Sequence, residues 1–345
     1  MGLYVGLDVS KQDTAICVRD DLGRIVWLGK TATDPDRIVG VLAKLGQSPD
    51  RVVLETGRTS NWLHNALRIR GLPVVCVDAR QAHAVLSQMH NKTDANDAAL
   101  LSELARTGFY RQVTVKRLEA QEQRTLLKAR ELVIQQRVDL DNTIRGFLAS
   151  FGVLLPKEPR RFADRVRLAI EGVASLKQII DPLLALRASV RAAIGELDGR
   201  LRRVARDLAD CRRLMTVPGV GAVTAFAFLA TIDDPARFAR SRSVGAYFGL
   251  TSRRYQSGER DSSGRISRRG DQTMRTLLYE AASALITRTN PASGAHLQAW
   301  ARALRSRVGH KKAAVALARK LAVLLHRIWM DGTFFMPRSD AEAGA

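Results

Sequence analysis

Four acidic residues have the types and spacing of a two-metal nuclease site. Asp8 ends the apolar run LYVGLD, Glu55 ends the run RVVLE, and Asp94 and Asp97 open a segment rich in alanine and leucine. Strand ends and the first turn of a helix can direct side chains into one cleft, and an i, i+3 pair shares one helix face. Converging carboxylates need a cation, and hard oxygen ligands without a His or Cys cluster favour Mg²⁺ or Mn²⁺ over zinc. Together the four acids predict a site that cleaves phosphodiesters, whereas any one alone is more typical of a solvated turn or a helix start.

The elements that must position these acids are short strands followed by alternating helices and strands. Apolar periodicity predicts strands at Leu3–Val9, Thr14–Arg19, Arg24–Leu28, Arg51–Thr56 and Pro73–Val77. It predicts helices at Asp36–Leu45, Asn61–Arg70 and Thr93–Thr107, the last with Thr93 as N-cap. This order favours a layered sandwich of the ribonuclease H type.

From about Val115 to Asp210 the apolar residues recur at helical spacing over long distances. This pattern predicts an antiparallel helical hairpin or an oligomerising coiled coil that acts mainly as a spacer. The segment TVPGVGAV, Thr216–Val223, then separates two helical patterns. It is typical of the glycine turn of a helix-hairpin-helix element, in which the backbone NH groups around Gly219 and Gly221 hold a phosphate, and equally typical of a tight interhelical turn.

A second chemical signal is the arginine-rich segment Gly249–Arg275, expected to be a loop. Its glycines allow close backbone approach to a ligand, and its arginines can fork onto phosphate oxygens. The residues expected to contact nucleic acid are Arg253, Arg254, Arg260, Arg265, Arg268 and Arg269. Ser257 lies near the centre, but a hydroxyl without a neighbouring base is a poor nucleophile, and from these residues alone Ser-Gly favours a turn.

The net charge indicates a polyanionic partner. The chain has 55 Lys and Arg against 34 Asp and Glu, a net charge of +21. Residues 1–110 hold 13 basic and 12 acidic side chains, so residues 111–345 hold 42 against 22. Such an excess favours nucleic acid over a merely solvated surface and predicts salt-dependent binding.

Composition also indicates the cellular compartment. Three scattered cysteines give neither a disulfide framework nor a metal spacing. No signal peptide is apparent, and charge interrupts the apolar stretch Leu321–Trp329. We expect a cytoplasmic protein without a membrane partner.

The order of motifs resembles the insertion-sequence transposases with a DEDD RuvC-like domain, the family numbered one hundred and ten. The motifs are GLDVSK, LETG, KTDANDA, VPGVG, GLTSRRYQSG and GRISRRGD, and the likeness spans roughly residues 2–330. The sequence departs from the family at Ser252, where GLTPRR is common. This change leaves every proposed chemical group in place.

The resemblance implies specific roles. The RuvC-like carboxylates correspond to Asp8, Glu55, Asp94 and Asp97, and the serine of the YxSG element to Ser257. Ser257 is then expected to form a covalent phosphoserine with DNA while Mg²⁺ on the carboxylates assists. Similar proteins use a structured bridge RNA that pairs with donor and target DNA. They assemble as dimers and tetramers in which the RuvC-like domain of one subunit meets the serine domain of another.

The expected fold class is α/β plus α. It comprises an RNase H-like (RuvC-like) DEDD domain in residues 1–112 and a long helical or coiled-coil linker in 113–212. A mostly helical serine transposase domain with the helix-hairpin-helix-like element follows in 213–332, and residues 333–345 form a flexible tail.

Three other functions compete with RNA-guided transposition. A metal-dependent junction resolvase or ribonuclease H needs the carboxylates but not Ser257. A sugar-kinase-like ATPase also begins with a strand and an Asp, but has no use for the KTDANDA pair. A non-catalytic DNA-binding protein needs none of the four acids to converge.

Overall fold

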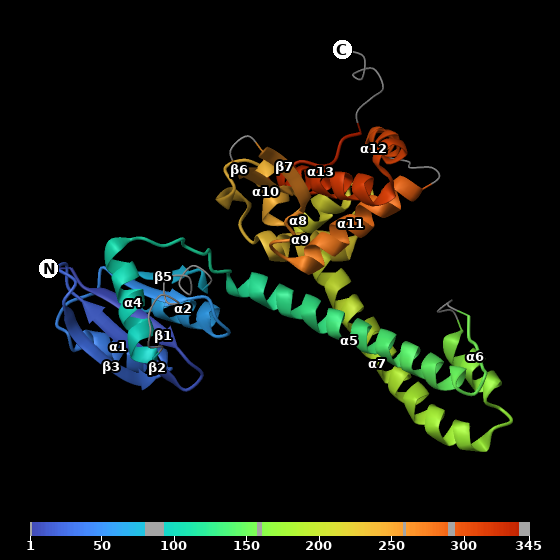
Figure 1. Cartoon of the computed structure of the whole chain (residues 1–345), viewed down its shortest axis with the longest axis horizontal. Coiled ribbons are helices and arrows are strands. Elements are labelled where there is room, and N and C mark those ends of the chain that lie inside the picture. Colours follow the sequence, from blue (N-terminus) through green and yellow to red (C-terminus); the bar gives the residue numbers. More distant parts are fainter. Residues whose placement is uncertain (1, 80–92, 157–160, 258–259, 289–293, 338–345) are drawn as a thin grey trace, which may run out of the picture. The chain divides into compact units, whose positions relative to one another are not determined.

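The computed structural model describes residues 2–79, 93–156, 161–257, 260–288 and 294–337. The chain divides into two compact units, Met1–Lys116 and Arg117–Ala345, seen in blue to teal and in green to red in Figure 1. The first unit is mixed α/β and the second is mostly helical, so the expected coarse class is confirmed. The finer domain limits at residues 112, 212 and 332 stay predictions.

A five-stranded sheet organises the N-terminal unit. Its strands are β1 (Tyr4–Val9), β2 (Asp13–Arg19), β3 (Ile25–Ala32), β4 (Arg51–Glu55) and β5 (Val74–Val77), in the spatial order β3-β2-β1-β4-β5. β1, β2 and β3 run antiparallel through tight connections, whereas β4 is parallel to β1 and β5 to β4. Parallel neighbours require crossover connections, and α1 and α2 lie in the two crossovers. All five predicted strands are present.

Helices cover the two faces of this sheet, as Figure 1 shows. On one face, α1 (Pro35–Ala43) and α2 (Ser60–Ile69) pack on the side chains of β1 and β4 that include Leu7 and Leu54. On the other, α4 (Asp94–Thr107) packs Leu101 and Leu104 against Val53. Successive side chains of a strand point to opposite faces, so Glu55 lies on the same face as Val53.

Close contact at Gly6 fixes how α4 lies on the sheet. A Cβ built on Gly6 would lie 2.2 Å from the Ala98 carbonyl oxygen and 2.2 Å from the Ser102 nitrogen. Only glycine leaves room for the helix backbone at this point of β1. Gly6 therefore faces α4, and Asp8, two residues further along the strand, lies on the same face.

Two long helices open the C-terminal unit. They are α5 (Leu118–Ala149) and α7 (Ala174–Asp207), with the short α6 (Phe162–Ala169) between them. Ion pairs join Arg130 to Asp198 and Arg187 to Asp141, so residue numbers fall on α7 as they rise on α5. The helices are therefore antiparallel, which confirms the hairpin alternative for a single chain.

The remainder of this unit is a helical cluster around an apolar core. Its central helix α9 (Ala222–Ile232) is almost entirely buried. The surrounding elements are α8 (Ala209–Met215), η1 (Pro235–Arg237), α10 (Arg242–Tyr247), β6 (Ser252–Ser257), β7 (Arg260–Ile266), α11 (Gln272–Thr287), α12 (Ala295–Val308) and α13 (His310–Asp331). None of the helices in the described ranges has the length and apolar character that crossing a membrane requires.

Candidate active site and nucleic-acid interface

Two of the predicted carboxylates lie on neighbouring strands. β1 and β4 are parallel, with Leu7 opposite Leu54, and the next residues along each strand are Asp8 and Glu55. The alternation of the two strands directs both side chains to the face that α4 covers. Both residues are partly buried. The pairing of β1 with β4 is what places these two residues side by side, and their role as metal ligands stays a prediction.

The other two carboxylates open the helix on that face. The Thr93 hydroxyl accepts a hydrogen bond from the Asn96 nitrogen at 3.2 Å, which caps α4 and places Asp94 and Asp97 in its first turn. α4 packs on β1 through the contact of Gly6 with Ala98, directly after Asp97. The start of the helix and the end of the strand therefore belong to one region of this unit.

A lysine that the sequence analysis did not single out lies in this region. The Lys30 ammonium on β3 contacts the Asp94 carboxylate at 2.6 Å. The hydrogen bond and charge of Lys30 hold the pKa of Asp94 below its usual range. Conversely, the bond to Asp94, then its charge, and further the charges of Asp13 and Asp8, raise the pKa of Lys30. Lys30 and Asp8 both pair with Ala15 across the sheet, one from each side.

The carboxylates do not form a finished metal site. Among the described residues, no three His, Cys, Asp or Glu side chains lie close enough together to hold a metal ion. The donor set still fits Mg²⁺ or Mn²⁺ chemically, since it consists of carboxylate oxygens on one sheet face and one helix start. Asp94 contacts Lys30 instead, and the convergence of Asp8, Glu55, Asp94 and Asp97 on a metal ion stays a prediction.

The arginine-rich segment is a β-hairpin in the structure, not the loop that the sequence predicted. β6 and β7 are antiparallel, and Ser257, the last residue of β6, pairs with Arg260. Gly258 and the side chains of Ser257 and Arg260 lie outside what the structure describes. The hairpin base is closed by two backbone hydrogen bonds, Ser267 N to Thr251 O at 2.8 Å and Arg268 N to Gly249 O at 3.1 Å.

The hairpin arginines have different surroundings. Arg253 donates to the Ser267 carbonyl at 3.2 Å, along its own hairpin. Arg265 and Arg268 are exposed and line a groove on the same unit. Arg254 and Arg269 are also exposed. Nucleic-acid contacts by any of them stay predictions.

The glycine turn Thr216–Val223 connects α8 to α9, as expected. Gly219 has φ +84°, and a Cβ there would lie 2.7 Å from the Ala281 carbonyl oxygen of α11. Packing alone therefore requires glycine at this position. Gly221 is the N-cap of α9 and has no such constraint. A phosphate contact at this turn stays a prediction.

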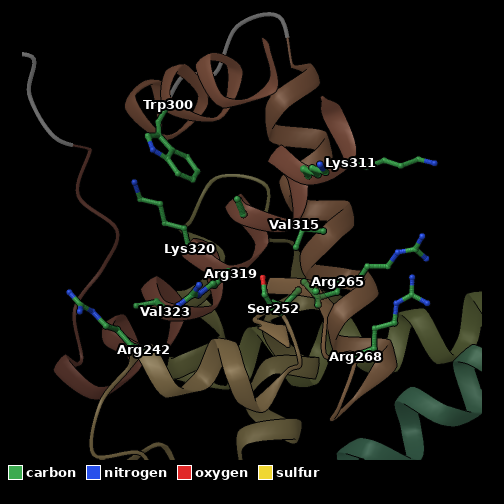
Figure 2. A pocket seen from close by; sticks show the side chains of 15 residues that line it. Arg242, Ser252, Arg265, Arg268, Trp300, Lys311, Val315, Arg319, Lys320 and Val323 are labelled. Atoms are coloured by element: carbon green, nitrogen blue, oxygen red, sulfur yellow. The ribbon is translucent and has the colours of Figure 1, made fainter. Parts of the chain in front are cut away.

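Several basic residues beside the hairpin arginines were missed by the sequence analysis. Arg242 comes from α10, and Lys311, Lys312, Arg319 and Lys320 come from α13. Together with Trp300 of α12 they line the same groove, shown in Figure 2. One signal was available: two basic pairs stand eight residues apart in the pattern of α13, which puts them on one helix face. The contribution of α10 could not be foreseen.

Comparison with known proteins identifies the family. A protein-family model described as Transposase IS116/IS110/IS902 family matches residues 211–298. A second family model, for DEDD transposases of the IS110 type and described as Transposase, matches residues 5–152. The chain is 29% identical over 326 residues to the transposase for insertion sequence element IS1111A of Coxiella burnetii, covering 93% of this chain and 88% of that protein. It is also 29% identical to the transposase for insertion sequence element IS1328 of Yersinia enterocolitica, over 71% of this chain and 74% of that one. A putative transposase of Sinorhizobium fredii, y4pF/y4sB, is 32% identical over 70% of this chain and 63% of its own length. These matches cover both units, and the chain belongs to the IS110 family of insertion-sequence transposases.

Proposed function

We propose that this transposase cleaves and joins DNA strands through a phosphoserine at Ser257, assisted by divalent metal on Asp8, Glu55, Asp94 and Asp97 and guided by RNA. The observation that carries this proposal is the arrangement on one sheet face. Two carboxylates end adjacent parallel strands, and two more open the helix that covers them. A lone catalytic carboxylate would need no such grouping.

The sheet supports an RNase H-like assignment for the N-terminal unit. Three antiparallel strands followed by two parallel ones, with helices on both faces, match the layered sandwich expected from the sequence. In this arrangement the central strand β1 carries Asp8, and its parallel neighbour carries Glu55. Both acids thus lie on strands that are paired on both sides.

Mg²⁺ bound to these carboxylates would polarise a phosphodiester and stabilise the developing negative charge. The hydrogen bond and charge of Lys30 lower the pKa of Asp94 and so favour the charged form that a metal requires. To bind metal, Asp94 must exchange the Lys30 ammonium for the ion. Both partners are more than half exposed, so this exchange does not leave a buried charge without a partner.

Ser257 supplies the nucleophile in this proposal. Its hydroxyl oxygen forms a bond to phosphorus as the bond from phosphorus to one deoxyribose oxygen breaks. The serine loses its proton and the departing oxygen gains one. Because one phosphoester bond replaces another, the bond energy is conserved for rejoining the strand. Two of the thiols are unsuited to the role, because burial raises the pKa of Cys76 to about 11 and that of Cys211 to about 12.

RNA guidance and assembly into dimers or tetramers complete the proposal and rest on the family resemblance. Residues 111–345 hold 42 basic against 22 acidic side chains, a surplus that supports binding of polyanions such as DNA and RNA. With a base-pairing guide, the protein would read mainly backbone shape and charge. The alternative is a metal-dependent resolvase with no serine-linked intermediate.

A gel that detects covalent protein–DNA adducts distinguishes the phosphoserine mechanism from the metal-dependent resolvase. Purified protein is incubated with labelled element-end DNA, element RNA and Mg²⁺, denatured, and examined for protein-linked DNA. We expect Ser257→Ala to lose the adduct and the strand exchange. Ser262→Ala, an exposed serine of the opposite strand, is the matched control and should retain both. Cleavage that persists in Ser257→Ala and still requires Mg²⁺ would support the resolvase.

The carboxylates are tested in the same assay. Asp8→Asn and Asp97→Asn should abolish strand cleavage while leaving DNA binding intact, since binding resides mainly in the basic C-terminal unit. Full cleavage by both variants would refute the proposed catalytic role of the carboxylates on this sheet face.

A further inference from the structure

We infer that the groove formed by α10, α12, α13 and the β6–β7 hairpin binds a single-stranded segment of nucleic acid, holding its phosphates and stacking an unpaired base on Trp300. This basic groove has a volume of about 1160 Å³ and lies within the C-terminal unit. The inference extends the proposed function by naming a binding site. It does not depend on the Ser257 chemistry.

Charge is the first argument. Seven lysines and arginines line the basic groove, and no acidic residue does. Within the described part of the chain, none of these seven cations is paired with a carboxylate, whereas Arg124, Arg130 and Arg187 of the same unit each form an ion pair with an aspartate. Like charges around one groove repel each other, and a polyanion removes that repulsion. A ligand with several phosphates fits this lining better than one with a single anionic group.

The shape of α13 is the second argument. Its core face is fully buried, but a second face presents Lys312, Val315, Arg319 and Val323 at spacings of three and four residues. The two valines are partly buried and form an apolar floor, and the cations stand along it. From Lys312 to Val323 the helix rises about 16 Å, the length of about five stacked nucleotides. This alternation suits a chain of apolar bases joined by charged phosphates.

The aromatic side chain is the third argument, and it selects the strandedness. Trp300 of α12 is 40% exposed and lines the basic groove. The Lys320 ammonium lies over its ring, 4.4 Å from the centroid, as the neighbouring sticks in Figure 2 show. A flexible lysine can move from the ring to a phosphate and leave that face to a base. Bases of a duplex are already stacked on each other, so an available indole favours an unpaired base.

The position of the basic groove connects it with the hairpin. Ser252, Gly264 and Arg265 line it, so one wall is the β6–β7 hairpin itself. Ser257 is five residues along β6 from Ser252, about 17 Å of strand. A nucleic-acid strand bound in the basic groove thus contacts the β6–β7 hairpin, which carries the proposed nucleophile Ser257. Much of the lining comes from α12 and α13, past residue 298 where the family match ends.

Binding assays with the full chain test this inference. Labelled 12-nucleotide probes are used as single-stranded DNA, single-stranded RNA and blunt duplex DNA, with fluorescence polarisation at several salt concentrations. We expect Trp300→Ala to weaken single-strand binding by about 5- to 150-fold and Trp300→Phe by less than about fivefold, because stacking survives on a smaller ring. Duplex affinity should stay within about twofold of the wild type, because duplex bases are not free to stack on the indole. Trp62→Ala, a similarly exposed tryptophan of the N-terminal unit, is the matched control and should change nothing.

The charge contribution is measured by salt dependence. Arg319→Gln/Lys320→Gln should reduce the steepness of log K against log salt by about 1.4, because each single-strand phosphate contact contributes about 0.7. The control pair Arg200→Gln/Arg203→Gln, also exposed but on α7, should not reduce it.

Equal losses on single-stranded and duplex probes, or no loss in Trp300→Ala, would overturn the inference. A loss confined to RNA probes assigns the basic groove to a guide, and one confined to DNA assigns it to a donor or target strand; both support a single-strand site. Trp300→Phe guards against misfolding, since it preserves the packing volume better than alanine. Repeating the binding with Ser257→Ala separates the two proposals: intact binding without an adduct supports the basic groove whatever becomes of the serine chemistry.

Discussion

Substituting alanine for Gly6 tests whether the contact of β1 with α4 positions the carboxylates. The added Cβ would lie 2.2 Å from two backbone atoms of α4, the Ala98 oxygen and the Ser102 nitrogen. Ordinary contact begins at 3.4 Å, so strand and helix must separate by about 1.2 Å. Backbone atoms cannot rotate away as a side chain can. We therefore expect a destabilisation at or above the upper end of the usual range of about 1–3 kcal/mol for an overpacked core.

The same displacement moves Asp94 and Asp97 relative to Asp8, because they open the helix that is pushed away. A misplacement of about 1 Å at a catalytic site can cost about 100-fold in rate. We expect transposition of a plasmid-borne donor element to fall by about that factor in Gly6→Ala, at a temperature where the protein is still folded. DNA binding should persist, because the C-terminal unit is not altered.

Gly40→Ala provides the matched control. Gly40 lies in α1 of the same unit, and a Cβ there meets nothing within 4 Å. Alanine inside a helix should raise the stability by about 0.5–1 kcal/mol without affecting transposition. If Gly6→Ala and Gly40→Ala had equal melting temperatures and equal transposition frequencies, the argument that this contact positions the acids would be refuted.

Two further substitutions probe charges at defined positions. Lys30→Gln should raise the pKa of Asp94 toward its ordinary value, because the hydrogen bond and charge that lower it are removed. The stability that Asp94 contributes is present above its unfolded pKa and is lost as the pH falls through its folded pKa, so this loss of stability in acid should be smaller in Lys30→Gln. Carboxyl NMR titration measures the pKa of Asp94, and the melting temperature as a function of pH measures the loss of stability. An Asp94 titration unchanged by Lys30→Gln would contradict the pairing. In the helical hairpin, Asp141→Leu should destabilise the C-terminal unit by about 3–5 kcal/mol in denaturant unfolding, because it leaves Arg187 buried without its carboxylate. The double variant Asp141→Leu/Arg187→Met should recover most of the loss, and failure of the single variant to destabilise would show that the pair carries no such cost.

The sheet and the positions of its acids could be predicted because each depends on local pattern. Alternating apolar residues identify β1 and a continuous apolar run identifies β4, and each acid follows its run, so local pattern alone assigns Asp8 and Glu55 to the carboxyl ends of two short segments. Thr93 and the residues after it have the order of a capped helix, which the structure confirms. Which strands are neighbours does not follow from the pattern, and the pairing of β1 with β4 in the structure is what brings Asp8 next to Glu55.

The parts that could not be predicted depend on distant partners. The strand SRRYQS has no apolar alternation, so β6 forms because β7 pairs with it and not because its residues favour a strand. Lys30 reaches Asp94 across 64 positions of sequence. The basic groove gathers residues from Arg242 to Val323 that no local period connects.

The segregation of charge along the chain has a physical reason in the proposed chemistry. A carboxylate that must bind Mg²⁺ loses affinity for it when a cation lies nearby, and Lys30 shows that one ammonium already suffices to engage Asp94. A nucleic-acid surface needs the opposite, many cations without carboxylates, as in the basic groove. The near balance of 13 basic and 12 acidic residues in 1–110, against 42 and 22 in the rest, lets both conditions hold in one chain. In the proposed chemistry Lys30 is a cation that the metal ion must displace from Asp94, and a polyanionic substrate that brings its own metal ions would favour this exchange.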